Sequence, residues 1–123
     1  MFNRVEYRIG LGIQEDRNGH IIPPIVYGRA IALIGERAAE LFGGYTITDT
    51  TGGWVDGHGK LIEEPGITLS ILVEGHSRTA DPVRQTRDEQ VIAFARFAGR
   101  ALRQHSVALI LPDGRAGIIE CGD

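Results

Sequence analysis

The chain has one cysteine, no excess of basic residues and no long hydrophobic run, and each shortage excludes a class of protein. Cys121 has no partner for an internal disulfide bond, so nothing requires an oxidising compartment. The 16 acidic residues outnumber the 13 basic ones, giving a net charge of −3, whereas nucleic-acid-binding proteins usually carry a basic surplus. No run approaches the roughly 20 apolar residues of a membrane-spanning helix, and residues 1–10 lack a signal-peptide core. We therefore expect a cytosolic protein that binds neither nucleic acid polymers nor membranes.

The sequence also lacks the usual groupings of catalytic and metal-binding residues. The histidines fall in predicted turns or at the ends of elements, and no two have the spacing of metal ligands: His20, His58, His76 and His105. No nucleophile-elbow motif and no Cys/His arrangement occurs. Because no nucleophile, metal site or base stands out, we expect no catalytic residues, no metal and no cofactor, and a protein that binds a ligand rather than an enzyme.

What is present is a clear succession of strand and helix patterns in a single domain, residues 1–123. Period-two alternation predicts strands, and apolar residues at helical spacing predict two helices. The predicted ranges are a strand over 5–13, a helix over 25–42, strands over 45–51 and 67–75 with a hairpin over 54–62 between them, a helix over 82–104, and strands over 105–112 and 115–121. The order β-α-β-β-α-β-β indicates an α+β fold, a ferredoxin-like sandwich whose antiparallel sheet carries both helices on one face and has an extra edge strand.

The second face of this sheet is then open. Tyr7, Trp54 and Leu72 can contribute to it, and a partner subunit can cover such an apolar face. A polar, solvated face is an alternative that the sequence leaves equally open. Pro65 and Gly66 predict a break or bulge just before the strand over 67–75.

Three arginines on the second predicted helix indicate a site for an anion. Arg96, Arg100 and Arg103 recur at i, i+4 and i+7, on the side opposite the predicted apolar stripe. Guanidinium groups suit phosphate because each can donate two parallel hydrogen bonds. The alternative is a solvated ridge of arginines without a ligand.

Trp54 follows two glycines, Gly52 and Gly53, and this arrangement has two interpretations. In the first, the ring stacks on a base while nearby backbone N–H groups meet a phosphate, and Asp49 and Thr50 form hydrogen bonds with a ribose. In the second, Trp54 closes one end of the sandwich and the glycines permit a bulge.

The order of several short motifs is similar to that of a known family. The motif "YRIGLG" precedes a loop with "NG", a helix ends in "LFGGYT", and "GGWVDGHGKLIEEPG" follows before an apolar strand, a long helix and "SVALI". This order resembles small phage and prophage proteins, most of all the phage Thoeris anti-defence sponges. The resemblance implies a homo-oligomer, from a dimer to a hexamer, in the host cytosol during infection. It also implies that the protein sequesters a cyclic nucleotide immune signal, a cyclic ADP-ribose isomer or a cyclic oligonucleotide, without cleaving it.

In that family an aromatic ring lies against the adenine and arginines lie against the pyrophosphate. The resemblance therefore implies Trp54, or else Phe97, as the ring. It implies phosphate ligands among the arginines of the second helix: Arg96, Arg100 and Arg103.

Two other classes of function stay open. A small oligomeric enzyme with the same fold needs a carboxylate or histidine inside a pocket, and Glu63, Asp49 and His58 are the candidates. A phage module that inhibits a host protein would instead use the open sheet face or the arginine ridge.

Overall fold

The computed structural model describes residues 3–74 and 82–122 as one α+β domain. Its elements are β1 (Arg4–Gly12), α1 (Pro24–Phe42), β2 (Thr46–Val55), β3 (Leu61–Glu74), α2 (Pro82–Ala101), β4 (Ser106–Ile110) and β5 (Ala116–Glu120). Within the described ranges, no helix is long and apolar enough to cross a membrane.

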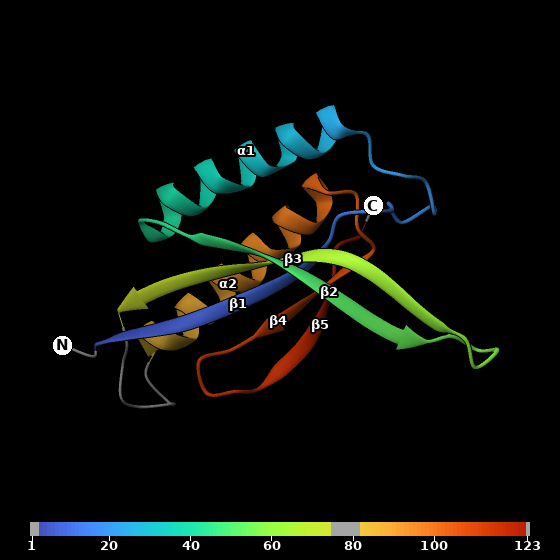
Figure 1. Cartoon of the computed structure of the whole chain (residues 1–123). Helices are drawn as coiled ribbons and strands as arrows, with labels where there is room; N and C mark the ends of the chain where they lie inside the picture. Colours follow the sequence, from blue (N-terminus) through green and yellow to red (C-terminus); the bar gives the residue numbers. More distant parts are fainter. Residues whose placement is uncertain (1–2, 75–81, 123) are drawn as a thin grey trace.

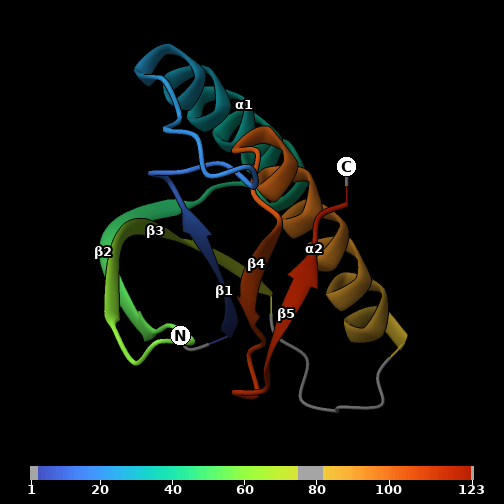
Figure 2. The same ribbon diagram turned by 90° about the vertical axis from the view of Figure 1, so that its right-hand side faces the viewer.

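All strands belong to one antiparallel sheet in the order β2-β3-β1-β4-β5. The arrangement β4-β1-β3-β2 is that of a ferredoxin-like fold, and β5 is added beside β4 as an edge strand. Both helices lie on the same side of the sheet (Figures 1 and 2). The predicted element order and fold class are therefore confirmed.

Alternation along the two central strands separates the faces of the sheet. Where β1 and β3 pass under the helices, the large side chains on the helix side are buried: Tyr7, Ile9, Leu11, Ile67, Leu69 and Ile71. A stripe on α2 and the turn after it packs into the same core: Val91, Phe94, Ala95, Ala98 and Leu102. Burial of these two sets keeps α2 against the sheet.

Tyr7 belongs to this core, so its predicted contribution to the open face is wrong. Its side chain is 0% exposed, and its hydroxyl donates a hydrogen bond to the Asp88 carboxylate on α2. A buried phenol needs such a partner, because an unpaired hydroxyl would lose its hydration without compensation. Leu72 and Trp54, in contrast, are exposed as expected.

The hairpin of β2 and β3 is longer and more continuous than predicted. Its two strands stay in register from Thr46–Ser70 to Val55–Leu61, so the predicted break or bulge at Pro65–Gly66 is wrong. Proline is tolerated there because β1 ends at Gly12, opposite Gly66, so Pro65 has a neighbouring strand on one side only. The hairpin curls away from the helices and makes one face of the sheet concave (Figure 2).

Both helices end at left-handed residues. Gly43 ends α1 with φ of 87°, and its N–H donates to the Ala39 carbonyl. The second helix ends at Ala101 instead of the predicted residue 104, because Arg103 adopts φ of 56°. In the sequence, Asp81 before Pro82 is typical of a helix N-cap, and this residue lies outside the described residues.

Close packing of α2 on the last strand depends on Gly99. A β-carbon at this position would lie 2.2 Å from the Cys121 sulfur and 2.8 Å from Cγ1 of Val107. Only a glycine lets the helix approach β4 and the segment after β5 so closely.

We expect Gly99→Ala to lower the free energy of unfolding by roughly 1–3 kcal/mol, because the added methyl group overpacks the core. Gly28→Ala is the matched control, since a β-carbon there meets no atom within 4 Å. That variant should be more stable by about 0.5–1 kcal/mol through helix propensity. Urea denaturation of both variants checks this packing, and equal shifts in the same direction would contradict it.

Candidate functional site

The concave face of the sheet holds a trough with a volume of about 590 Å³. Residues of all five strands line it. The helices cover the opposite face of the sheet (Figure 2). This volume lies within the roughly 300–1,000 Å³ that small-molecule sites usually have.

Small residues make up much of the trough lining: Gly10, Gly12, Gly52, Gly53, Gly66 and Ala108. Gly10 lies opposite Ala108, and a β-carbon on Gly10 would be 3.5 Å from that of Ala108. At Gly52 a β-carbon would meet no atom within 4 Å, so a side chain there would project into open space. The trough therefore exists because these strand positions lack large side chains, and its floor presents backbone to a ligand.

A carboxylate and an aromatic ring stand beside this floor. Glu64 lies opposite Gly52, and Trp54 lies opposite Ile62, so the two side chains are diagonal neighbours on one face of the hairpin. Both line the trough, together with Thr50. The Trp54 side chain is 53% exposed, so much of its ring is accessible to a ligand.

Glu64 was not among the predicted site residues, although Glu63, its neighbour, was a candidate for an enzyme. Successive side chains of a strand point to opposite faces, so Glu63 lies on the outer face and Glu64 on the trough face. The signal available in the sequence was the alternation with Ile67, Leu69 and Ile71, which puts even-numbered residues of this strand on the open face.

Of the other predicted residues on this hairpin, Thr50 and Trp54 are brought together in the trough. Asp49 lies opposite Ile67, on the helix side of the sheet, and is exposed. His58 lies in the turn of the hairpin, where its N–H donates to the Asp56 carboxylate at 2.8 Å. Neither Asp49 nor His58 lines the trough.

The predicted residues of the second helix lie elsewhere, along α2 and the C-terminal end of β5. Arg96 Nε donates to the Glu120 carbonyl at 3.0 Å, and Arg100 Nε donates to the Cys121 carbonyl. Phe97 packs against the core, and the Arg37 guanidinium lies 4.7 Å from its ring centroid. These residues do not line the trough, so two separate regions carry the predicted site residues.

Arg103 belongs to neither α2 nor β4. It follows the end of α2, and its carbonyl accepts a hydrogen bond from the Arg17 N–H at 2.8 Å. This contact ties the loop after β1 to the end of α2.

The only cysteine does not supply a nucleophile. Burial raises the pKa of the Cys121 thiol, and the nearby charges of Arg100 and Arg96 offset this in part. A thiol with a raised pKa is protonated at neutral pH, and Cys121 is 0% exposed. Among residues 3–74 and 82–122, no three His, Cys, Asp or Glu side chains gather as metal ligands.

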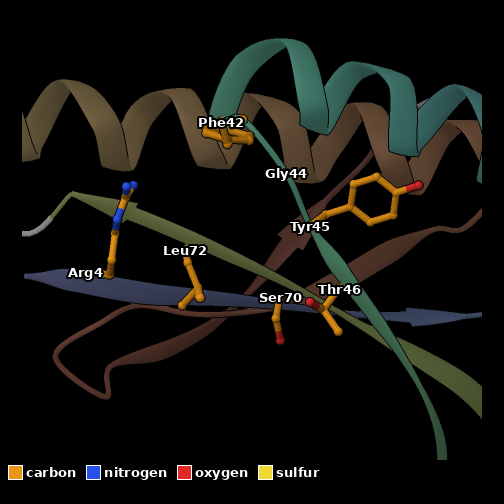
Figure 3. A pocket seen from close by; sticks show the side chains of 8 residues that line it. Arg4, Phe42, Gly44, Tyr45, Thr46, Ser70 and Leu72 are labelled. Carbon is orange, nitrogen blue, oxygen red and sulfur yellow. The ribbon is translucent and has the colours of Figure 1, made fainter. Parts of the chain in front are cut away.

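A second concavity, of about 390 Å³, lies between the end of α1 and the hairpin (Figure 3). Tyr45 and Phe42 contribute rings to it, and Arg4 contributes a cation. The Tyr45 ring rests on α1 at Gly35, where a β-carbon would lie 2.2 Å from its hydroxyl. The described residues that line this concavity include no carboxylate and none of the predicted site residues, so the trough is the better candidate.

Two solved structures share this fold. A phage SAM lyase in complex with S-methyl-5'-thioadenosine matches with a TM-score of 0.63 and 16% identity, over 96% of this chain and 90% of that one. A phage SAM lyase in the apo state matches with a TM-score of 0.61 and 19% identity, over 96% of this chain and 89% of that one. No protein-family model matches the chain, and neither does any curated protein.

These matches contradict the expectation that the protein is not an enzyme, and they agree with the general expectation of a phage protein that binds a small molecule. The expectation that the protein is not an enzyme is contradicted, because both matched structures are of a lyase, which is an enzyme. Both matched structures are of phage proteins, and one of them holds S-methyl-5'-thioadenosine, a small adenosine derivative. Neither match points to a cyclic ADP-ribose isomer or to a sponge.

The exposure of Trp54 predicts the effect of removing it. Trp54→Ala should lower the free energy of unfolding by no more than about 1.5 kcal/mol, because the ring is not enclosed in the core. Thermal and urea denaturation measure this change. A loss of 3 kcal/mol or more, typical of a buried aromatic residue at about 3–5 kcal/mol, would mean that Trp54 closes the sandwich instead.

Proposed function

We propose that this protein is a lyase that cleaves S-adenosylmethionine, or a close sulfonium analogue, and releases S-methyl-5'-thioadenosine. One observation carries the proposal: a carboxylate, Glu64, and an aromatic ring, Trp54, stand beside a trough floor built largely of glycine. The fold shared with a SAM lyase that holds S-methyl-5'-thioadenosine supports this class of substrate.

Each part of such a substrate has a counterpart in the trough. A flat purine can lie against the glycine floor, where backbone replaces side chains. The Trp54 ring can face the sulfonium group, because the face of an aromatic ring attracts a cation. Glu64 can accept a charge-assisted hydrogen bond from the α-ammonium group, and Thr50 can bond to a ribose hydroxyl.

The reaction needs no protein nucleophile, which agrees with the protonated, buried thiol of Cys121. The bond between the sulfonium sulfur and the γ-carbon breaks, and its electron pair stays on sulfur as a neutral thioether. The amino-acid fragment either closes on its own carboxylate, giving a lactone, or loses a β-proton to a base, giving an alkene. Glu64 orients the fragment in the first route and accepts the proton in the second. Lactone formation neutralises a carboxylate and a sulfonium together, which a water-poor trough favours.

The proposal also includes a homo-oligomer and an anti-defence role. Two apolar side chains that line the trough are exposed: Trp54 on the hairpin and Ile118 on β5. A second copy of the chain that covers them would enclose the trough and exclude water from it. We therefore keep the expected homo-oligomer, and an anti-defence role in the host cytosol in which the small molecule is destroyed. Light scattering that shows only a monomer at all concentrations would remove the oligomer from the proposal.

Glu64→Gln should lower kcat/KM for S-adenosylmethionine by at least about tenfold, since it removes a charge-assisted contact. Glu63→Gln is the matched control and should act like the wild type, because its side chain lies on the outer face. Chromatography with mass detection follows S-methyl-5'-thioadenosine and identifies the lactone or the alkene.

Absence of turnover in the wild type, or equal losses in the two glutamate variants, would reject the lyase or the role of Glu64. Isomers of cyclic ADP-ribose serve as competing ligands in the same assay. Tight binding of these isomers with no binding of S-adenosylmethionine would overturn the proposed substrate.

A side chain on the trough floor should block the substrate without unfolding the protein. Gly52→Val adds a β-branched residue, which suits a strand, at a position with no atom within 4 Å of its β-carbon. Gly117→Val is the control on β5, where a β-carbon is equally free of contacts and lies outside the trough. We expect similar melting temperatures for both, with a KM raised about tenfold or more only for Gly52→Val. Equal KM values would contradict the position of the site.

A further inference from the structure

Four arginines come from the last turns of α2, the segment just after it and the loop after β1, and we call them the arginine cluster: Arg17, Arg96, Arg100 and Arg103. Arg17 comes from the loop after β1, and its backbone N–H donates to the Arg103 carbonyl at 2.8 Å. A concavity of about 200 Å³ lies beside them, lined by Arg17, His105, Glu120 and Gly122. A β-carbon on Gly122 would lie 3.4 Å from Nη2 of Arg100, so that guanidinium group reaches the same concavity.

Backbone carbonyls hold two of these guanidinium groups by one nitrogen each. Arg96 Nε donates to the Glu120 carbonyl at 3.0 Å, and Arg100 Nε donates to the Cys121 carbonyl. In both residues the contact uses Nε and leaves the terminal nitrogens to donate elsewhere. The two side chains are therefore oriented before any ligand arrives, which lowers the entropy cost of binding.

Arg103 occupies a backbone position that normally belongs to glycine. Its φ is 56°, and no other non-glycine residue in the described part of the chain has a positive φ. The N–H of Gln104 donates to the Gly99 carbonyl, and the N–H of Arg103 to the Arg100 carbonyl, which is the Schellman pattern with Arg103 at its left-handed residue. An arginine there strains the backbone, and such strain is often kept for a functional side chain.

The arginine cluster has few counter-charges. Among the described residues, the ion pairs involve Arg8, His20, Arg37 and Arg115, and none of the four arginines of the cluster forms one. Among residues 3–74 and 82–122, two carboxylates are near: Glu120 lines the concavity, and the charge of Arg103 acts on Asp16. The pKa of Asp16 is lowered mainly by the His20 backbone N–H and least by the charge of Arg103. In the part of the chain that the structure describes, four arginines and two carboxylates make this region positively charged, in a protein with a net charge of −3.

We propose that the arginine cluster and its concavity form a second binding site, for a small molecule that carries phosphate groups. Guanidinium forks match the oxygens of phosphate and can each donate two parallel hydrogen bonds. The site is distinct from the trough, because the two share no lining residue and S-adenosylmethionine has no phosphate. The concavity is small and the protein is acidic overall, so a nucleotide phosphate or free pyrophosphate fits better than a nucleic acid polymer.

Calorimetric titration with inorganic pyrophosphate, at physiological ionic strength, tests the site. We expect saturable binding with one ligand per chain. Arg103→Gly should raise the melting temperature, because glycine relieves the strain at φ of 56°, yet weaken pyrophosphate binding about tenfold. Arg17→Gln should weaken binding by a similar factor. Arg29→Gln, the same charge change at an exposed position on α1, is the control and should bind like the wild type.

Three results would overturn the site: no saturable binding by the wild type, equal weakening in Arg29→Gln, or sulfate binding as tightly as pyrophosphate. Single-stranded DNA binding more tightly than pyrophosphate would also reject the proposed class of ligand. Adenosine diphosphate and pyrophosphate are compared to separate a nucleotide from a free phosphate. The test is independent of the proposed lyase activity, because Glu64→Gln should bind pyrophosphate normally whether or not the wild type turns over S-adenosylmethionine.

Discussion

The pairing of β1 with β3 is the constraint on which the rest of the structure depends. On the helix side this pair buries large apolar residues, such as Ile9 against Leu69, and these contacts hold the helices. On the opposite side the same strands carry glycines, Gly10, Gly12 and Gly66. A strand has only two faces, so the alternation that builds the core also leaves the other face hollow. Core and trough are two results of one pattern.

The hairpin of β2 and β3 turns this hollow face into a site. It extends beyond the end of β1, and there Pro65 has a neighbouring strand on one side only, a position where proline is tolerated. The free part of the hairpin curls away from the helices (Figure 2) and brings Glu64 and Trp54 over the glycine floor. A carboxylate and an aromatic ring on a rigid ladder are held by backbone hydrogen bonds, which favours precise positioning of a ligand.

The end of α2 shows a different balance between stability and binding. Gly99 allows the helix to approach Cys121 closely, whereas Arg103 occupies a left-handed position that glycine would fill without strain. Glycine at position 99 improves packing, whereas arginine at position 103 provides a guanidinium group but strains the backbone. Two of the neighbouring arginines also donate to carbonyls near the end of β5, so the same side chains contribute to the fold and to the arginine cluster.

The sequence by itself determined the element order, the fold class and the buried stripes, because periods of two and 3.6 residues report which side of an element is apolar. The continuous hairpin was missed because tolerance of Pro65 depends on where a different strand ends. Glu64 was missed in favour of Glu63, although alternation separates them, because only the sheet order shows that a face of this strand encloses a trough. The separation of Trp54 from Arg96 and Arg100 is likewise a property of the tertiary structure. Strand pairing and helix packing decide which residues distant in sequence lie close together, and a local sequence pattern does not show this.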